Sequence, residues 1–115
     1  MDKRVLKQLK EFEKGDYIRV SWFDANDQRG RLEELQENPE VLVEDWGIFL
    51  GVEGSPQYVL LGKAYVPEDH RWDATCIHLE LVQGAVLVAK HVTKIPRRYR
   101  VEFQSSERRR VRVFG

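Results

Sequence analysis

Cysteine and long apolar runs are scarce in this sequence, and the shortage of each excludes a class of protein. Cys76 is the one cysteine, so the internal disulfide framework of small secreted domains is excluded. The longest unbroken apolar run, Ala85 to Ala89, is far shorter than the roughly 20 residues of a membrane helix. Residues 1–13 contain no apolar region of the kind that a secretory signal requires. We therefore expect a reducing, cytoplasmic setting and no membrane partner.

The chain has 115 residues, which suits one domain, and 42% hydrophobic residues exclude a disordered protein. Its formal net charge of zero hides an asymmetry. Residues 1–89 have ten Lys/Arg and seventeen Asp/Glu, a net of −7, and residues 90–115 have nine Lys/Arg and two Asp/Glu, a net of +7. This split indicates that the C-terminal part either neutralises the acidic part or binds a polyanion. High charge with one cysteine and one methionine also hints at a thermophilic protein.

Hydrophobic spacing predicts one short helix followed by strands. Residues 2–13 carry apolar residues at helical spacing among lysines and glutamates, and Gly15 suits the end of a helix. Five later segments read as strands, separated by turns of Gly, Pro, Asn and Asp: 17–23, 29–35, 41–50, 58–66 and 75–88. Residues 67–73 read as a polar loop. The sequence thus predicts a mainly β fold, with a small antiparallel barrel spanning residues 16–88.

Period-2 alternation predicts which side chains face the inside of this barrel. The inward residues are expected to be Ile18, Val20, Trp22, Leu32, Val41, Val43, Leu60, Ile77, Leu79 and Leu81.

Two stretches resemble the sequence motifs of the Sm-like family of SH3-type small barrels. Gly30-Arg31-Leu32, Leu35 to Glu40 and Val41 to Asp45 match the spacing of the first motif without a gap, and Leu60 to Val66 occupies the frame of the second. The resemblance covers about residues 3–66 and implies a short helix before a strongly bent five-stranded sheet. The uridine-contacting Asp and Asn of the family are replaced by Gln36 and Glu40, and its Arg by Leu61. We therefore expect no uridine-specific pocket at these positions.

No catalytic or metal-binding pattern is present, so we expect no enzyme, no cofactor and no metal. Cys76 and His78 are spaced to share one face of a strand, but a zinc site requires four ligands and no pattern supplies the others. We interpret them as a half-buried cysteine and a surface histidine. Of three tryptophans, Trp22 is expected inside. Trp46 and Trp72 are expected at the surface, where they either stack on bases or serve structure and subunit contacts.

The arginines of the C-terminal region are the strongest functional signal, because the guanidinium matches phosphate and stacks on bases. Seven of them fall within residues 97–115: Arg97, Arg98, Arg100, Arg108, Arg109, Arg110 and Arg112. The sequence favours a non-enzymatic nucleic-acid-binding accessory protein, with RNA preferred over DNA. The alternative is a homo-oligomeric interaction module, in which the acidic body of one subunit docks the basic tail of another.

Residues 90–115 are expected to extend the domain formed by residues 1–89 as a basic β-hairpin. Alternation predicts strands on either side of a three-residue loop at Ser105-Ser106-Glu107. That register places Val101 opposite Val111 and makes Arg100 and Arg112 a like-charge pair, which an anion between them would relieve.

Overall fold

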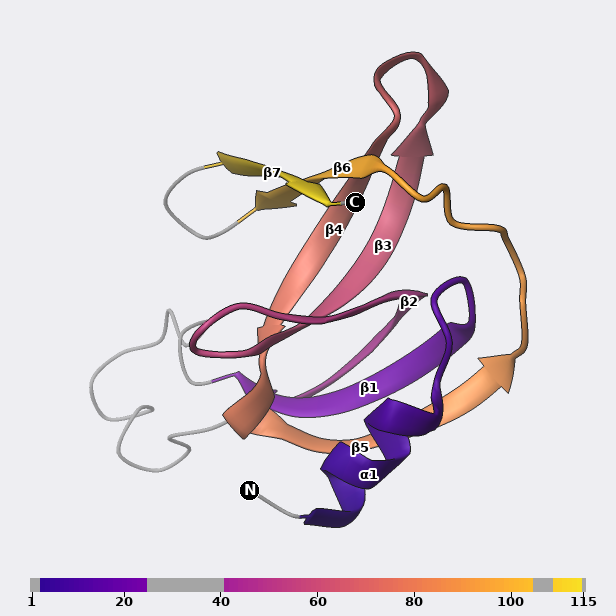
Figure 1. Cartoon of the computed structure of the whole chain (residues 1–115). Coiled ribbons are helices and arrows are strands. Elements are labelled where there is room, and N and C mark those ends of the chain that lie inside the picture. Colours follow the sequence, from indigo (N-terminus) through magenta and orange to yellow (C-terminus); the bar gives the residue numbers. More distant parts are fainter. Residues whose placement is uncertain (1–2, 25–40, 105–108, 115) are drawn as a thin grey trace.

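The computed structural model describes residues 3–24, 41–104 and 109–114, with residues 24, 104 and 109–114 described by their backbone alone. Figure 1 shows a short helix and a strongly bent sheet. In chain order the elements are α1 (Lys3–Glu11), β1 (Tyr17–Asp24), β2 (Val41–Glu53), β3 (Tyr58–Val66), the 3-10 turn η1 (Pro67–Asp69), β4 (Arg71–His78), the 3-10 turn η2 (Leu79–Leu81), β5 (Val82–Ala89), β6 (Tyr99–Gln104) and β7 (Arg109–Phe114). Within these ranges no helix is long and apolar enough to cross a membrane.

The seven strands form one sheet in the order β5-β1-β2-β3-β4-β6-β7. All neighbours pair antiparallel except β4 and β6, which are parallel. The mainly β fold and the N-terminal helix are therefore confirmed. The sheet does not close into the expected barrel, since β5 and β7 form its two edges, and the hairpin joins it through the parallel pairing of β6 with β4.

Strand β3 is buried on both faces, which explains its continuous apolar run. Val59 and Leu61 belong to a first core cluster, whereas Leu60, between them, belongs to a second. Successive side chains of a strand point to opposite faces, so the bent sheet has a core on each side of β3.

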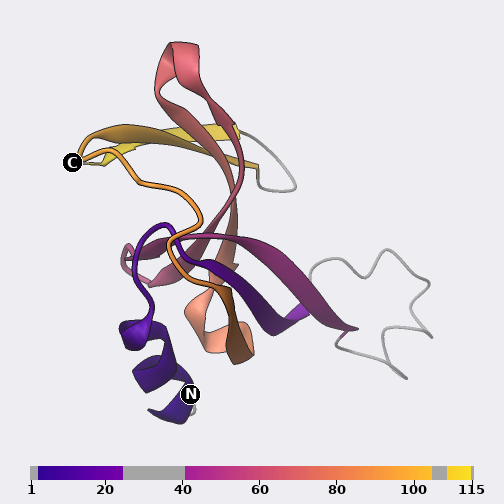
Figure 2. The same ribbon diagram turned by 90° about the vertical axis from the view of Figure 1, so that its right-hand side faces the viewer.

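The first cluster lies under the N-terminal helix. Val5 and Leu9 of α1 are buried there against Ile18, Val20 and Ala85 of the sheet. The other members of the cluster are Phe49, Val59, Leu61, Ile77, Leu79 and Val82. Figure 2 shows α1 on the side of β1 and β5, away from the C-terminal hairpin.

The second cluster lies under β6. Tyr99, Val101 and Phe103 are buried against Leu50 and Leu60. The hairpin of β6 and β7 is therefore held by apolar packing as well as by its pairing with β4. To reach β4, residues 90–98 run along one side of the molecule from the end of β5 (Figure 1).

Several core expectations require correction. Val41 is 48% exposed and Val43 is half-buried, because the first half of β2 extends beyond both clusters. The segment 75–88 is two strands joined by η2, and within that turn Leu79 is buried while Leu81 is only half-buried. Trp22 is half-buried and packs at the rim of the first cluster. Leu32 lies outside the described residues, as does the expected strand 29–35.

Trp72 is the largest correction. It was expected in a polar loop, but β4 begins at Arg71 and Trp72 is 6% exposed within the second cluster. A Cβ added to Gly62 would lie 2.6 Å from the Trp72 ring, so this glycine makes the room that the indole occupies. The polar neighbours of Trp72 in sequence face the opposite side of a strand and do not mark a loop.

The predicted C-terminal hairpin is confirmed, but its register differs by one residue. Val101 lies opposite Arg112 and Arg100 opposite Val113, so the predicted pairing of Arg100 with Arg112 is wrong. Four residues, 105–108, separate the two strands instead of three. The prediction required apolar residues of the two strands to match each other. In the structure Val101 is buried by β3 and β4 instead, which removes that requirement.

Candidate anion-binding site

A cleft of about 400 Å³ opens beside the segment that connects β5 to β6. Its lining consists of Lys14, His91, Thr93, Lys94, Ile95, Pro96, Arg97 and Tyr99. Two lysines and an arginine are thus among the lining residues, and none of the eight is acidic. A cleft with cations and no carboxylate in its wall suits an anionic group.

Lys14 and Tyr99 form one wall of the cleft through direct contact. The Lys14 ammonium donates to the Tyr99 hydroxyl at 3.2 Å and lies 5.5 Å from the centre of its ring. The same hydroxyl donates to the backbone oxygen of Leu50 at 3.3 Å. A lysine ammonium has three protons, so this contact leaves donors that can meet a ligand.

The turn between α1 and β1 holds the other wall in place. The backbone oxygen of Gly15 accepts hydrogen bonds from Val92 at 3.0 Å and Thr93 at 3.4 Å. Gly15 also donates to the backbone oxygen of Phe49 at 3.0 Å, which ties the turn to β2. Its φ of +101° lies in the left-handed region, and a Cβ there would be 2.2 Å from the Thr93 oxygen. Glycine is therefore required for this close approach.

Asp16 reinforces the same junction from a fully buried position. Its carboxylate accepts hydrogen bonds from the backbone of Glu13 at 2.9 Å and of His91 at 3.0 Å. Burial by itself would raise the pKa of Asp16, but these two hydrogen bonds and the nearby charges of Lys90 and His91 lower its pKa below the ordinary value. Asp16 is therefore a charged structural anchor for the start of the cleft segment.

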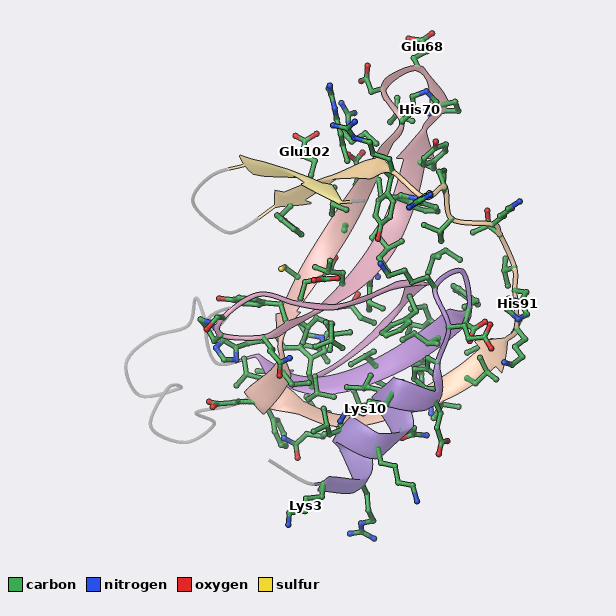
Figure 3. The ribbon with its side chains drawn as sticks, viewed as in Figure 1. Lys3, Lys10, Glu68, His70, His91 and Glu102 are labelled. Atoms are coloured by element: carbon green, nitrogen blue, oxygen red, sulfur yellow. The ribbon has the colours of Figure 1, made fainter. Side chains whose placement is uncertain are left out.

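Glu13 is the second acidic residue of this junction, and it is already paired. Its carboxylate lies 3.4 Å from the Lys90 ammonium and 3.1 Å from His91 Nε2. Figure 3 shows His91 on the outer side of the connecting segment. In contrast, no carboxylate among the described side chains pairs with Lys94 or Arg97.

Comparisons of the chain with protein-family models, with curated proteins and with solved structures find no match. The function must therefore be argued from the geometry of the chain itself.

The predicted arginines are only partly brought together. Arg97 lines the cleft, and Arg98 and Arg100 are exposed on the chain that leaves it. Backbone register places Arg109, Arg110 and Arg112 on β7, next to β6, and Arg108 lies outside the described residues. Gln36 and Glu40, the replaced uridine contacts, also lie outside them, whereas Leu61 is buried in β3.

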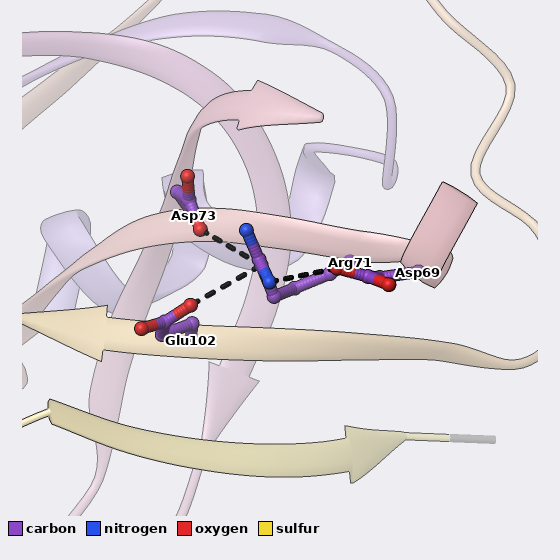
Figure 4. A network of polar contacts seen from close by, with 4 residues as sticks. All are labelled: Asp69, Arg71, Asp73 and Glu102. Atoms are coloured by element: carbon purple, nitrogen blue, oxygen red, sulfur yellow. Dashed lines mark hydrogen bonds and ion pairs between the residues drawn. The ribbon is translucent and has the colours of Figure 1, made fainter. Parts of the chain in front are cut away.

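One cationic side chain near the hairpin is neutralised. The Arg71 guanidinium on β4 contacts Asp69 at 2.9 Å and Asp73 and Glu102 at 3.2 Å (Figure 4). Glu102 lies on β6, so this network links the hairpin to β4. The polar side chains of β6 are thus mixed in charge next to Arg71, with Arg100 and Glu102 on the same strand.

The two tryptophans of the predicted site lie apart from the cleft. Trp46 is 43% exposed on β2, opposite Arg19 of β1, and its backbone oxygen accepts a hydrogen bond from Lys63. It remains available as a stacking surface. Trp72 is enclosed in the second cluster, so a stacking role for its ring is not compatible with this structure.

Cys76 and His78 show no metal-site geometry. Cys76 packs against the second cluster, and the His78 ring lies against Tyr58 at 5.1 Å between centroids. Both are half-buried, so the surface position predicted for His78 is only partly correct. Across the described ranges, no group of three or more His, Cys, Asp or Glu residues is placed to hold a metal ion.

Sequence reasoning missed Lys14, Lys94 and Tyr99 as members of one site. Lys94 belongs to the basic region 90–115, so the charge distribution of the sequence could have identified it. Lys14 lies 85 positions from Tyr99, and only the fold brings the two together.

Proposed function

We propose that this protein binds nucleic acid without acting on it chemically, with RNA preferred over DNA. The observation that carries the proposal is the cleft in which Lys14, Lys94 and Arg97 converge with no acidic residue in its lining. Phosphate binding by lysine and arginine is the main source of affinity in such proteins.

A polymer is favoured over a small anion because the positive charge continues beyond the cleft. Arg98 and Arg100 follow it directly and are exposed. A chain of phosphates can contact the cleft and then Arg98 and Arg100, whereas a single small anion would use only the cleft.

The preference for RNA rests on the Sm-like resemblance. The resemblance implies a short helix before a strongly bent, five-stranded antiparallel sheet, and the helix α1 followed by the antiparallel strands β1 to β5 supports it. The hairpin of β6 and β7 goes beyond that arrangement. Scaffold similarity alone does not transfer function, so the basic cleft and not the scaffold is the main argument.

The proposal is tested by removing two cleft charges. For Lys94→Ser combined with Arg97→Ser, we expect the affinity for single-stranded RNA to fall by about tenfold at fixed salt. The plot of log affinity against log salt should also become less steep by about 1.4, or about 0.7 for each of two lost phosphate contacts. Fluorescence anisotropy with a labelled oligonucleotide measures both quantities.

The matched control is Lys3→Ser combined with Lys7→Ser. Both lysines are exposed on α1, and their removal changes the net charge by the same amount. If the control weakens RNA binding as much as the cleft variant does, binding reflects total charge and the cleft is not the site. A parent protein that binds no RNA even at low salt refutes the function.

A further inference from the structure

Strand β5 is an open edge of the sheet and carries the longest apolar run of the chain. Val86, Leu87 and Val88 are 44%, 40% and 51% exposed. On its inner side β5 pairs with β1, and on its outer side no described residue pairs with it. Exposed edges offer free backbone donors and acceptors to another strand, so proteins protect them with charges, prolines or bulges.

β5 is protected only at its two ends. The strand Val82–Ala89 contains no charged residue and no proline. Its pairing with β1 is irregular between Tyr17 and Ile18 and between Ser21 and Trp22, but Gly84–Leu87 pairs with Ile18–Ser21 without interruption. Along this regular stretch the outer backbone donors and acceptors are available to a further strand.

The second edge of the sheet, β7, differs in charge. It carries Arg109, Arg110 and Arg112, which would stay without a counter-charge against the uncharged β5 of another molecule. The edge of β4 is already occupied by β6. Of the strands that the structure describes, only β5 therefore matches the β5 edge in both hydrophobicity and charge.

We propose that two copies of this chain associate through β5, paired antiparallel about a two-fold axis. A two-fold axis perpendicular to the sheet leaves each side chain on the same face of the shared sheet. A residue of one copy therefore pairs with a residue of the second copy whose side chain lies on that same face. Placing Val86 of the regular stretch on this axis sets it opposite its own counterpart and sets Ala85 opposite Leu87 of the second copy, both pairs on matching faces. Helix α1 lies against β5 on the inner face of each copy, and the shared sheet continues across the axis.

The two-fold relation allows a charge-swap experiment. Val86 is 44% exposed, so the fold should tolerate Val86→Lys despite its like-charged neighbour Arg19 on β1, whereas at the axis the substitution places two ammonium groups opposite each other. We expect the parent to sediment at twice its mass of 13.6 kDa at micromolar to millimolar concentration, and Val86→Lys to sediment as a monomer. Mixing the Val86→Glu protein with the Val86→Lys protein should restore a dimer, because a carboxylate of one chain then lies opposite an ammonium group of the other.

Val92→Lys is the matched control, because Val92 is 54% exposed but lies beyond the strand, and it should leave the dimer intact. Circular dichroism of each variant shows whether the fold is kept. A parent that stays monomeric across this range overturns the proposal, as does a Val86→Lys variant that still dimerises. Masses above the dimer would show head-to-tail contact of β5 with β7 and overturn the proposal. If a mixture of the Val86→Lys and Val86→Glu proteins forms no dimer, the two-fold pairing is excluded. None of these outcomes depends on RNA.

Discussion

At the scale of single residues, Gly15 and Asp16 join three parts of the chain that are remote in sequence. Gly15 binds β2 and the segment 92–93 through its backbone, and Asp16 binds the backbone of His91 through its carboxylate. The sequence predicts a helix over residues 2–13 that ends at Gly15, but α1 ends at Glu11 and Gly15 lies in the turn that leads into β1. The backbone oxygen of Gly15 also positions one wall of the cleft, through its hydrogen bonds with Val92 and Thr93. These partners are 77 and 78 positions away, so the local sequence pattern does not reveal them.

We expect substitution of Gly15 to destabilise the protein and substitution of Gly84 to be tolerated. Gly15→Ala should lower the free energy of unfolding by about 1–3 kcal/mol, because the left-handed backbone is strained and the Cβ meets the Thr93 oxygen. Gly84→Ala, where no atom lies within 4 Å of the added Cβ, should change it by less than about 0.5 kcal/mol. Urea unfolding measures both, and equal losses in the two variants would contradict this account of Gly15.

Asp16 should contribute stability that depends on pH. Its folded-state pKa is lowered, so the contribution is complete above the unfolded value of about 3.9 and is lost as pH falls through the folded value. Asp16→Asn should cost about 1.5–3 kcal/mol at neutral pH, since charged acceptors form the stronger hydrogen bonds. Unfolding followed at neutral and at acidic pH should show the gap between parent and variant narrowing in acid. A gap independent of pH would mean that the charge of Asp16 has no role.

At the scale of elements, strand existence was predictable and strand partnership was not. The alternation in residues 99–104 and 109–114 predicted the hairpin because pleating imposes a period of two residues. The parallel pairing of β6 with β4 follows from burial of Tyr99, Val101 and Phe103 in the second cluster, and nothing in the local pattern names that partner. The missed register and the missed burial of Trp72 have this common cause.

The hairpin should be held by its apolar face. Val101 is fully buried in the second cluster, so Val101→Ala should lower the free energy of unfolding by about 2 kcal/mol through lost burial and a cavity. Val92→Ala makes the same chemical change at a 54% exposed site and should cost less than about 0.5 kcal/mol. A negligible effect of Val101→Ala on denaturant unfolding would mean that the hairpin is not part of the cooperative unit.

At the scale of the whole molecule, the charge asymmetry of the sequence predicted a basic C-terminal region but not the shape of its site. The cleft combines Lys14 from the turn after α1 with Lys94 and Arg97 from the segment between β5 and β6. These positions meet because β5 and β6 lie at opposite sides of the sheet, which forces the connecting segment across the molecule past that turn. A topology that long-range pairing decides is not readable from local spacing.

The central claim, that RNA lies in this cleft, is tested most directly by nuclear magnetic resonance. In a titration of the labelled protein with a short single-stranded RNA, we expect the largest amide shifts at Lys14 and across residues 91–100, with smaller changes on α1. Shifts confined to α1 or to the exposed side of β2, or no shifts at low salt, would contradict the account.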